Sequence, residues 1–495
     1  MNTPSLARCV MVLGTTSGAG KSWLTTALCR HYARQGLRVA PFKAQNMSNN
    51  ARVVPTPKQG SWGGFGEIGS AQYFQALAAR AAPEVRMNPL LLKPEADTRS
   101  QVVLMGEVSR ELSDMPWRGR SERVWPHITA ALDALRAEND VVVIEGAGSP
   151  AEINLHASDI VNMRVARHAQ ARCLLVTDID RGGAFAHLYG TWALLPPEER
   201  ALIQGFVLNR FRGDAALLAP APQMLQDLTG VPTLATLPMW WHHGLPEEDG
   251  VFDDRTRASG EVRTTVAVIA YPRISNLDEF QPLKNVPGVR LRWARTPADC
   301  AGADWIVLPG SKHTSADLAW LRAQGLDRAV ATHAAAGGRV LGICGGLQML
   351  GEALLDPHGI DGNAPGLGLL PLVTQFEEVK TVRPSHTTLG EVRGAWHALT
   401  GVTVSGYEIH HGQTVQHPAM AANGDVAHTV LPGLAWQNGA GNVLGLYQHG
   451  LFEDANVLRA LFGASAPTLD SVFDGLADFI ETHFDAGALE ALGRA

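Results

Sequence analysis

The sequence lacks the features of a membrane or exported protein. It contains no apolar run of the about 18 residues that a membrane-spanning helix needs. The N-terminal apolar run, Cys9 to Leu13, is too short for a signal peptide. Only five cysteines occur, an odd number without a CxxC pair or a disulfide spacing. We therefore expect a cytoplasmic protein with reduced thiols and no membrane partner.

Clusters of basic residues are missing as well. The net charge is −7, and no long run of lysine or arginine occurs. This balance argues against nucleic acid as the main partner. Internal repeats and low-complexity tracts are also absent, and the oligomeric state stays open. With 495 residues the chain exceeds the size of one ordinary core, so we expect two or three domains.

The first half of the chain alternates short apolar runs with helical patterns. This alternation is typical of an α/β domain with a doubly wound parallel sheet. Polar residues follow each apolar run directly, and in such sheets ligands bind at the carboxyl ends of the strands. The predicted strands are residues 9–13, 37–41, 141–144, 173–177 and 206–208.

A phosphate-binding loop follows the first of these strands. Its backbone amides and the start of the next helix favour an anion, Lys21 adds a point charge, and the Ser22 hydroxyl suits Mg²⁺. The strict P-loop pattern has glycine where Thr15 stands. Here Gly14 comes one residue earlier, so the loop is one residue longer. The predicted nucleotide site comprises Thr15, Gly18, Gly20, Lys21 and Ser22.

Other residues fit an ATP site in the same domain. Glu145 ends a buried strand and is placed to hold Mg²⁺ with Ser22, and Glu67 is a second candidate metal ligand. Asn209 follows the fifth strand and is placed to meet the nucleotide base. The alternative for Glu145 and Glu67 is a solvated loop carboxylate, and the alternative for Asn209 is an ordinary turn residue. Lys43 either bridges phosphate and an anionic substrate or is a surface lysine.

A second alternating series begins after the pattern lapses between Trp240 and Gly260. We expect an ATP-dependent first domain at residues 1–240, a linker at 241–261 and a second α/β domain at 262–495. A C-terminal helix capped by Thr468 belongs to this second domain. The predicted strands of the series are residues 265–270, 305–308, 340–343 and 443–447.

Cys344 stands between one of these strands and an apolar-periodic helix, with Gly342 and Gly346 around it. This spacing is that of a nucleophile elbow with sulfur in place of hydroxyl. The turn places the thiol at a helix N-terminus, where partial positive charge favours thiolate. The amide of Gly345 is placed to contribute to an oxyanion hole. A buried structural cysteine is the alternative.

A thiol nucleophile needs a base that accepts its proton and returns it to the leaving amine. His449 follows a predicted strand of the same domain and is the favoured candidate. His410 and His411 are rivals that read equally well as part of a binding loop. A further strand ends in a loop at Gly310, whose amides are placed to supply the second oxyanion donor.

Two parts of the chain resemble known families through these motifs. Residues 262–455 resemble a class I glutamine amidotransferase domain, because they share the elbow around Cys344, the loop at Gly310 and the strand-end His449. This resemblance implies that Gln348 contacts glutamine. Residues 5–235 resemble the ATP-dependent half shared with dethiobiotin synthetase, whose phosphate loop has the same extra residue.

The combination resembles the cobyrinic acid and cobyric acid synthase family. Long matching stretches include residues 41–50, 145–155 and 274–280. The resemblance implies ATP and Mg²⁺ as cofactors, L-glutamine as nitrogen donor and a corrinoid substrate. The expected reaction is amidation of the b, d, e and g carboxylates of cobyrinic acid a,c-diamide. The alternative is a cobyrinic acid a,c-diamide synthase or another amidase of this architecture. Expected substrate contacts are Lys43, Asn46 and Asp180.

One position departs from the amidotransferase pattern. Ordinary class I enzymes have a glutamate two residues after the histidine, where this chain has Leu451. Either Glu453 substitutes for that glutamate, or the site works as a Cys–His dyad.

Two other function classes compete with this interpretation. One is a cysteine hydrolase fused to an unrelated phosphate-loop domain, which the strand-end motifs in both halves disfavour. The other is a switch protein carrying an inactive module. Such proteins usually have a second lysine early in the loop, where this chain has Thr16.

Overall fold

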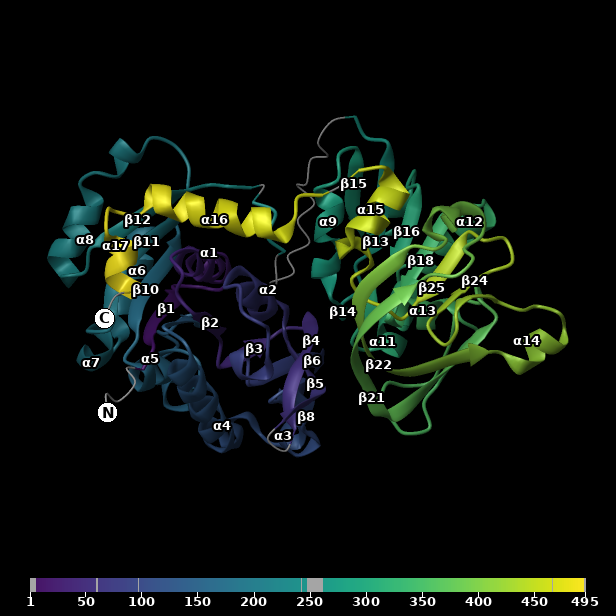
Figure 1. Ribbon diagram of the computed structural model, residues 1–495, viewed down its shortest axis with the longest axis horizontal. Helices are drawn as coiled ribbons and strands as arrows, with labels where there is room; N and C mark the ends of the chain where they lie inside the picture. The colour runs from purple at the N-terminus through teal and green to yellow at the C-terminus, as the bar shows by residue number, and fades with distance from the viewer. Residues whose placement is uncertain are drawn as a thin grey trace.

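The computed structural model describes residues 6–58, 61–96, 98–241, 243–246, 261–464 and 466–493. Two α/β domains lie side by side, the first drawn in purple to teal and the second in teal to green (Figure 1). This agrees with the predicted fold class. The expected linker at 241–261 lies largely outside the described residues.

The first domain is built on a parallel sheet with the strand order β12-β11-β10-β1-β9-β2. Alternate residues of β1 enter different apolar clusters, with Val10 and Val12 on one face and Met11 and Leu13 on the other. A parallel sheet covered on both faces needs such continuous apolar strands. The strands are β1 Arg8–Gly14, β2 Val39–Phe42, β9 Val141–Glu145, β10 Arg172–Asp178, β11 Ile203–Phe211 and β12 Thr233–Pro238.

Helices connect these strands as the alternating pattern predicts. The five predicted strands are confirmed, and β12 was not predicted. The main helices of this domain are α1 Lys21–Arg34, α2 Ser70–Ala78, α4 Trp117–Glu138, α5 Met163–Ala169, α6 Ala184–Leu194 and α8 Ala221–Thr229. Shorter helices are α3 Arg110–Asp114 and α7 Pro197–Arg200.

An insertion of short strands lies on the side of this domain that faces the second domain (Figure 1). One small sheet has the order β3-β6-β7-β8, and β4 and β5 form a separate antiparallel pair. The sequence analysis predicted none of these strands. They are β3 Gln45–Met47, β4 Ala51–Lys58, β5 Ser61–Gly69, β6 Leu90–Ala96, β7 Arg99–Leu104 and β8 Glu107–Val108.

The second domain has the strand order β15-β13-β16-β18-β25-β24-β23, parallel from β15 to β25. All four predicted strands are present in it. The strands are β13 Thr264–Ile269, β15 Val289–Ala294, β16 Trp305–Leu308, β18 Arg339–Ile343, β23 His428–Leu431, β24 Ala435–Gln437 and β25 Val443–Leu446. The flanking helices include α9 Gln281–Lys284, α10 Pro297–Cys300, α11 Thr314–Ala323, α12 Leu326–Ala335, α13 Gly345–Leu350 and α15 Ala455–Phe462.

A long antiparallel pair, β21 Leu372–Thr388 and β22 Thr403–Gln416, runs along the side of the second domain that faces the insertion (Figure 1). This pair was not predicted either. A two-stranded sheet joins β14 Ile274–Ser275 to β17 Gly310–Ser311. A 3₁₀ turn, η4 Leu277–Phe280, follows β14, and another, η6 Leu451–Glu453, follows β25.

The C-terminal helix corrects the expected domain boundary. Helix α16, Leu469–His483, packs along α1 of the first domain and not on the second domain to which the sequence assigned it (Figure 1). Its buried residues share an apolar cluster with β1, β9 and β12, because they form one face of the helix. These residues are Val472, Phe473, Leu476 and Ile480.

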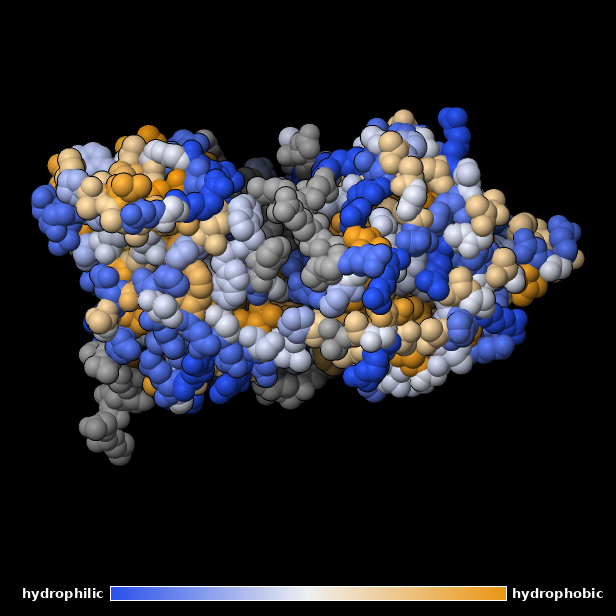
Figure 2. Space-filling model, turned by 90° about the horizontal axis from the view of Figure 1, so that it is seen from above, coloured by the Kyte–Doolittle hydropathy of each residue, from blue (hydrophilic) through white to orange (hydrophobic). Residues whose placement is uncertain are grey.

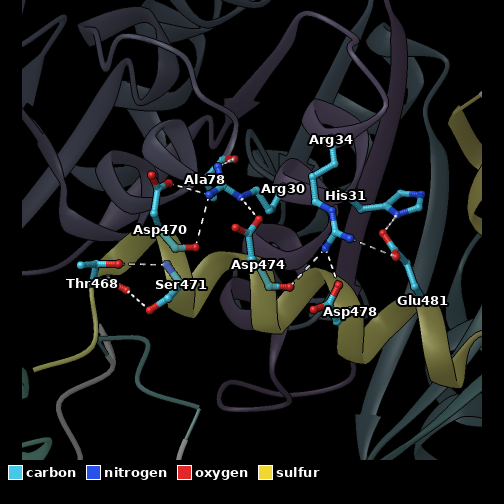
Figure 3. Close-up of polar contacts among 10 residues, drawn as sticks. All are labelled: Arg30, His31, Arg34, Ala78, Thr468, Asp470, Ser471, Asp474, Asp478 and Glu481. Carbon is cyan, nitrogen blue, oxygen red and sulfur yellow. Dashed lines mark hydrogen bonds and ion pairs between the residues drawn. The ribbon is translucent and has the colours of Figure 1, made fainter.

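Charged side chains reinforce this contact (Figure 3). Arg30 is buried and donates to Asp470 at 2.5 Å and to Asp474 at 2.8 Å. Thr468 caps α16 by accepting from the amide of Ser471, as predicted. The helix α17, Ala488–Gly493, then contacts β1. The chain therefore leaves the second domain after α15 and ends on the first.

The surface is mixed in character. Seen from above, hydrophilic residues cover much of both domains, and hydrophobic residues form small groups scattered among the hydrophilic ones (Figure 2). In the part of the chain that the structure describes, no helix has both the length and the apolar character required to span a membrane.

The placement of α16 predicts which domain a core substitution weakens. Phe473→Ala should lower the free energy of unfolding of the first domain by about 3–5 kcal/mol, because it removes a ring that is 1% exposed. Hydrogen exchange followed by mass spectrometry should become faster in residues 8–34 and 233–238. Phe65→Ala, at an exposed phenylalanine, is the matched control. Faster exchange confined to residues 339–355 would contradict the domain assignment.

Candidate active sites

The phosphate loop connects β1 to α1 as predicted. Gly20 has φ 102°, and a Cβ atom there would lie 2.1 Å from the amide nitrogen of Asn209. Only glycine fits this position. Lys21 Nζ donates to the carbonyl oxygens of Thr16 at 3.1 Å and Gly148 at 3.2 Å. The lysine is therefore folded over the loop, between two carbonyl groups that an anion would replace.

Glu145 lies at the centre of a buried polar cluster. It accepts from Ser22 at 2.8 Å, from Lys43 at 2.8 Å and from Gln75 at 2.5 Å. Burial raises the pKa of the carboxyl group, but the charge of Lys43 and the hydrogen bonds from Lys43, Gln75 and Ser22 together hold this pKa below its ordinary value. A hydroxyl beside an ionised carboxylate is a donor set that Mg²⁺ prefers. Ser22 and Glu145 therefore fit a metal bound to nucleotide phosphates.

The structure places Glu67 elsewhere. One carboxylate oxygen accepts from Lys93 at 2.7 Å and the other from Lys380 of the second domain at 2.5 Å. Among the described residues, Glu67 makes no hydrogen bond or ion pair with Ser22 or Glu145. Both lysines lower the pKa of Glu67 against the effect of burial. The expected metal role of Glu67 is corrected accordingly, and the residue belongs to an ion cluster between the domains.

The remaining predicted residues of the first domain have defined partners. Asn209 is buried and donates to the carbonyl oxygen of Ala19, so it supports the phosphate loop directly. The hydroxyl of Thr15 donates to Thr177 at 3.0 Å. The amide of Asn46 donates to Gln72 at 3.1 Å, and Asp180 accepts from Arg212 at 2.7 Å.

Cys344 occupies the predicted elbow between β18 and α13. Its backbone has φ 50° and ψ −106°, a strained conformation for a residue with a side chain. A Cβ atom at Gly346 would lie 1.8 Å from the carbonyl oxygen of Leu308, so the turn requires glycine there. The thiol is 5% exposed and contacts the carbonyl oxygen of Ile409 at 3.6 Å. Strain at a cysteine in a tight strand-to-helix turn is typical of a nucleophile.

His449 is the imidazole that meets this thiol. Its Nδ1 lies 3.2 Å from Glu279 Oε1, and its ring stacks on Tyr407 with centroids 5.3 Å apart. Burial lowers the pKa of His449, whereas the charge of Glu279 and a hydrogen bond with Cys344 raise it. The net result is a pKa of about 10. The site therefore favours the protonated form of the imidazole, which is the form that results when His449 takes the proton of the thiol.

Glu279 replaces the expected third residue, Glu453. The carboxylate of Glu453 accepts from Arg52 at 2.6 and 2.8 Å, whereas the carboxylate beside His449 is that of Glu279. Glu279 lies 170 residues before His449 in sequence. The only sequence signal for it was its place in the stretch 274–280, which matched the family.

The rival histidines have other partners. In His410, Nδ1 is hydrogen-bonded to the carbonyl oxygen of Gly412, and Nε2 is hydrogen-bonded to the carboxylate of Glu408. His411 contacts the carbonyl oxygen of Glu377, and burial lowers its pKa to about 4. Both line the cavity next to Cys344, but the arrangement around Glu279 favours His449 as the base.

The predicted oxyanion groups lie together. A Cβ atom at Gly345 would be 2.8 Å from the backbone nitrogen of Ser311, and one at Gly310 would be 2.9 Å from the ring of His449. Gln348 accepts from the hydroxyl of Thr314 at 3.0 Å and lines the cavity that contains Cys344. The loop after β16 and the elbow after β18 therefore present their backbones to one point.

The cavity at Cys344 is lined by both domains. Its charged residues form a cluster with an excess of lysine, in which Lys312 donates to Glu95 at 3.0 Å. Burial lowers the pKa of Lys380 to about 7, although the neighbouring Glu67 acts in the opposite direction. The charged lining residues are Lys93 and Glu95 of the first domain and Lys312, Asp361 and Lys380 of the second.

Comparisons with known proteins agree with both sites. Residues 10–246 match the CobQ/CobB/MinD/ParA nucleotide binding domain, and residues 265–457 match the CobB/CobQ-like glutamine amidotransferase domain. A cobyric acid synthase of Acidovorax ebreus is 80% identical over 98% of this chain and 99% of its own length. One from Variovorax paradoxus is 79% identical, over 98% of this chain and 99% of its own length.

The chain belongs to the cobyric acid synthase family. As a member of this family it is a glutamine-dependent amidotransferase ligase of cobalamin synthesis. The first domain is its nucleotide-binding synthetase domain and the second its amidotransferase domain.

In this member of the cobyric acid synthase family, the start of β4 and the residue before it bind the second domain. The amide of Ala51 donates to Asn276 Oδ1 at 2.9 Å, and Asn50 Oδ1 accepts from the amide of Leu277 at 3.0 Å. Arg52 binds Asp278 and Glu453 and is 2% exposed. Its guanidinium also lies over aromatic rings of both domains, namely Tyr73, Phe74 and Tyr407.

Removal of the Arg52 charge should weaken the protein in a pH-dependent way. Arg52→Met leaves the buried Asp278 and the partly buried Glu453 without their cation, which costs about 3–5 kcal/mol. Burial already raises the pKa of Glu453, and loss of Arg52 raises it further. A carboxyl with a raised folded-state pKa contributes stability at low pH that is lost as the pH rises through that pKa. The stability deficit of the variant should therefore be larger at pH 8 than at pH 5.

Denaturant unfolding at both pH values measures this deficit. The matched control is Arg393→Met, which removes a half-exposed arginine from the exposed Glu391. This control should change stability only slightly. An equal deficit for Arg52→Met at pH 5 and pH 8 would show that the carboxylates do not respond to its removal.

Proposed function

We propose that this chain uses ATP, Mg²⁺ and L-glutamine to amidate the b, d, e and g carboxylates of (adenosyl)cobyrinic acid a,c-diamide, giving cobyric acid. The observation that carries the proposal is the pairing of two sites in one chain. A thiol–imidazole site at Cys344 and a phosphate-loop site at Ser22 and Glu145 are joined by the buried β4 interface.

The amidotransferase site releases ammonia. His449 accepts the proton of the Cys344 thiol, and the thiolate attacks the side-chain amide of glutamine. The amides of Gly345 and the Gly310 loop stabilise the oxyanion. His449 returns the proton to the leaving nitrogen, which departs as NH₃, and water then hydrolyses the thioester to glutamate.

The lysine-rich cavity suits the other end of glutamine. Its lining includes Lys93, Lys312 and Lys380 beside Glu95 and Asp361, and Glu67 accepts from two of these lysines. The lysines are the groups of this lining that can pair with the α-carboxylate of the amino acid. Gln348 lines the same cavity as Cys344 and is our candidate for contact with glutamine.

The synthetase site activates the carboxylate. Lys21 and the loop amides bind the phosphates of ATP, and transfer of the terminal phosphoryl group to a corrinoid carboxylate gives an acyl phosphate. Bound Mg²⁺ neutralises phosphate charge, and Ser22 and Glu145 are the residues that would hold it. Ammonia that reaches this site without contacting bulk water displaces phosphate and forms the amide.

Lys43, Asn46 and Asp180 are the proposed substrate contacts. Lys43 is paired with Glu145, so it stands where phosphate and carboxylate must meet. Asp180 is partly exposed and paired with Arg212. We place the reaction in the cytoplasm, in keeping with five cysteines that are all free.

Replacement of the nucleophile should separate the two activities. Cys344→Ala is expected to abolish amidation with glutamine, because no other group can form the thioester. Amidation with ammonium salts at raised pH should persist, because the synthetase site needs only NH₃. Product formation followed by chromatography with each nitrogen source measures both. Continued use of glutamine by this variant would refute the nucleophile assignment.

The substrate is tested by mass spectrometry of corrinoids incubated with enzyme, ATP, Mg²⁺ and glutamine. Cobyrinic acid a,c-diamide should undergo four successive carboxyl-to-amide conversions. The matched substrate is cobyrinic acid, which the alternative a,c-diamide synthase would amidate twice. An unchanged a,c-diamide together with doubly amidated cobyrinic acid would favour that alternative.

A further inference from the structure

The carboxylate next to His449 comes from a segment outside the class I amidotransferase pattern, in which the glutamate lies two residues after the histidine. Glu279 belongs to η4 and is fully buried. Its Oε1 lies 3.2 Å from His449 Nδ1, and its Oε2 accepts from the amide of Gly450 at 3.0 Å. The carboxylate is therefore held against both the ring and the backbone that carries the ring.

This contact fixes which ring nitrogen faces the thiol. With Nδ1 directed at Glu279, Nε2 is the nitrogen left for Cys344, and the ring is also held flat against Tyr407. An imidazole held from two sides loses little freedom when it accepts the thiol proton. A buried carboxylate beside it also stabilises the imidazolium that results.

The position of Glu279 is set by the other domain. The three residues before it are each bound by the first domain: Asn276 by Ala51 of β4, Leu277 by Asn50 just before β4, and Asp278 by Arg52 of β4. Asn276 has φ 54°, so its backbone is held in a left-handed turn while its side chain accepts from Ala51. The synthetase domain therefore contacts each of the three residues that precede Glu279.

We infer that Glu279 is the positioning residue for His449, and that β4 of the synthetase domain holds it in place. Glu279 acts through the imidazole and does not touch glutamine. This inference rests on the proposed roles of Cys344 and His449. It adds a third residue from outside the segment where class I amidotransferases carry theirs.

The inference predicts a change in the pH profile of glutamine hydrolysis. The thiolate–imidazolium pair persists up to the pKa of His449, which is about 10 against an ordinary 6.5. Loss of the Glu279 charge lowers this pKa, so the pair is lost at lower pH and the alkaline limb of kcat/KM moves down. Other titratable groups around the ring and its two partners, Glu279 and Cys344, include Arg52, Tyr271, Asp278, Asp317, Tyr407, Tyr447 and Glu453.

Two substitutions at Glu279 and one control test the inference in the full-length protein. Glu279→Gln should lower kcat/KM for glutamine by on the order of 10²-fold, the scale of general acid–base catalysis, and move the alkaline limb to lower pH. Glu279→Asp keeps the charge, so its alkaline limb should stay near that of the wild type. Glu453→Gln removes the carboxylate nearest in sequence to His449 and should also leave the limb in place.

Amidation driven by ammonium salts shows whether each variant is folded, because Glu279 takes no part in the synthetase site. An unchanged alkaline limb in Glu279→Gln would overturn the inference, and so would a limb that moves only in Glu453→Gln. Should Glu279→Gln lose ammonium-driven amidation as well, Glu279→Asp decides. A wild-type limb there supports the inference, and a shifted limb opposes it.

Failure of this inference is separable from failure of the proposed function. If Cys344→Ala still uses glutamine, the nucleophile assignment is wrong, regardless of the results for the Glu279 variants. If Cys344→Ala is inactive with glutamine and Glu279→Gln keeps the wild-type profile, only the positioning role falls.

Discussion

The buried guanidinium of Arg52 is the interaction on which the arrangement of the two sites depends. It lies between Asp278 and Glu453 of one domain while its backbone belongs to the other. Buried ion pairs contribute little net stability, since desolvation offsets their attraction, but removal of one partner is costly. A planar guanidinium bound to two carboxylates also accepts few alternative geometries. Arg52 therefore fixes how the domains meet more than how tightly they bind.

The ten residues that end at Arg52 connect the two reactions. Lys43 pairs with Glu145 at the phosphate site, and Asn50 binds the loop that carries Glu279. An extended segment of this length spans at most about 36 Å, so the two sites are joined by one short piece of backbone. Such a connection suits the chemistry, because ammonia released before an acyl phosphate exists would be protonated and lost.

Local patterns were sufficient to predict the central sheets, the phosphate loop and the elbow, because each depends on neighbours in sequence. They were insufficient for contacts between distant segments. The apolar stripe of α16 predicted a helix, but a stripe does not identify the surface it covers, and the helix lies on the first domain. Glu67 resembled a metal ligand in a glycine-rich stretch, yet its partner Lys380 lies 313 residues away. Short strands such as β3 and β8 give too little periodicity to detect.

The displaced glutamate follows from the same limit and has a structural cause. Two residues after His449 the chain carries Leu451, which is 1% exposed and belongs to the apolar core with Phe280 and Phe452. A carboxylate at that position would be buried among these side chains without a partner. The charge is supplied instead by η4, which packs on η6 and presents Glu279 from the opposite side. Because η4 is itself held by Asn50 and Arg52, the orientation of His449 depends on contact with the synthetase domain. Cys344, His449 and Glu279 all come from the amidotransferase domain, but the turn that carries Glu279 is held by contacts with the synthetase domain.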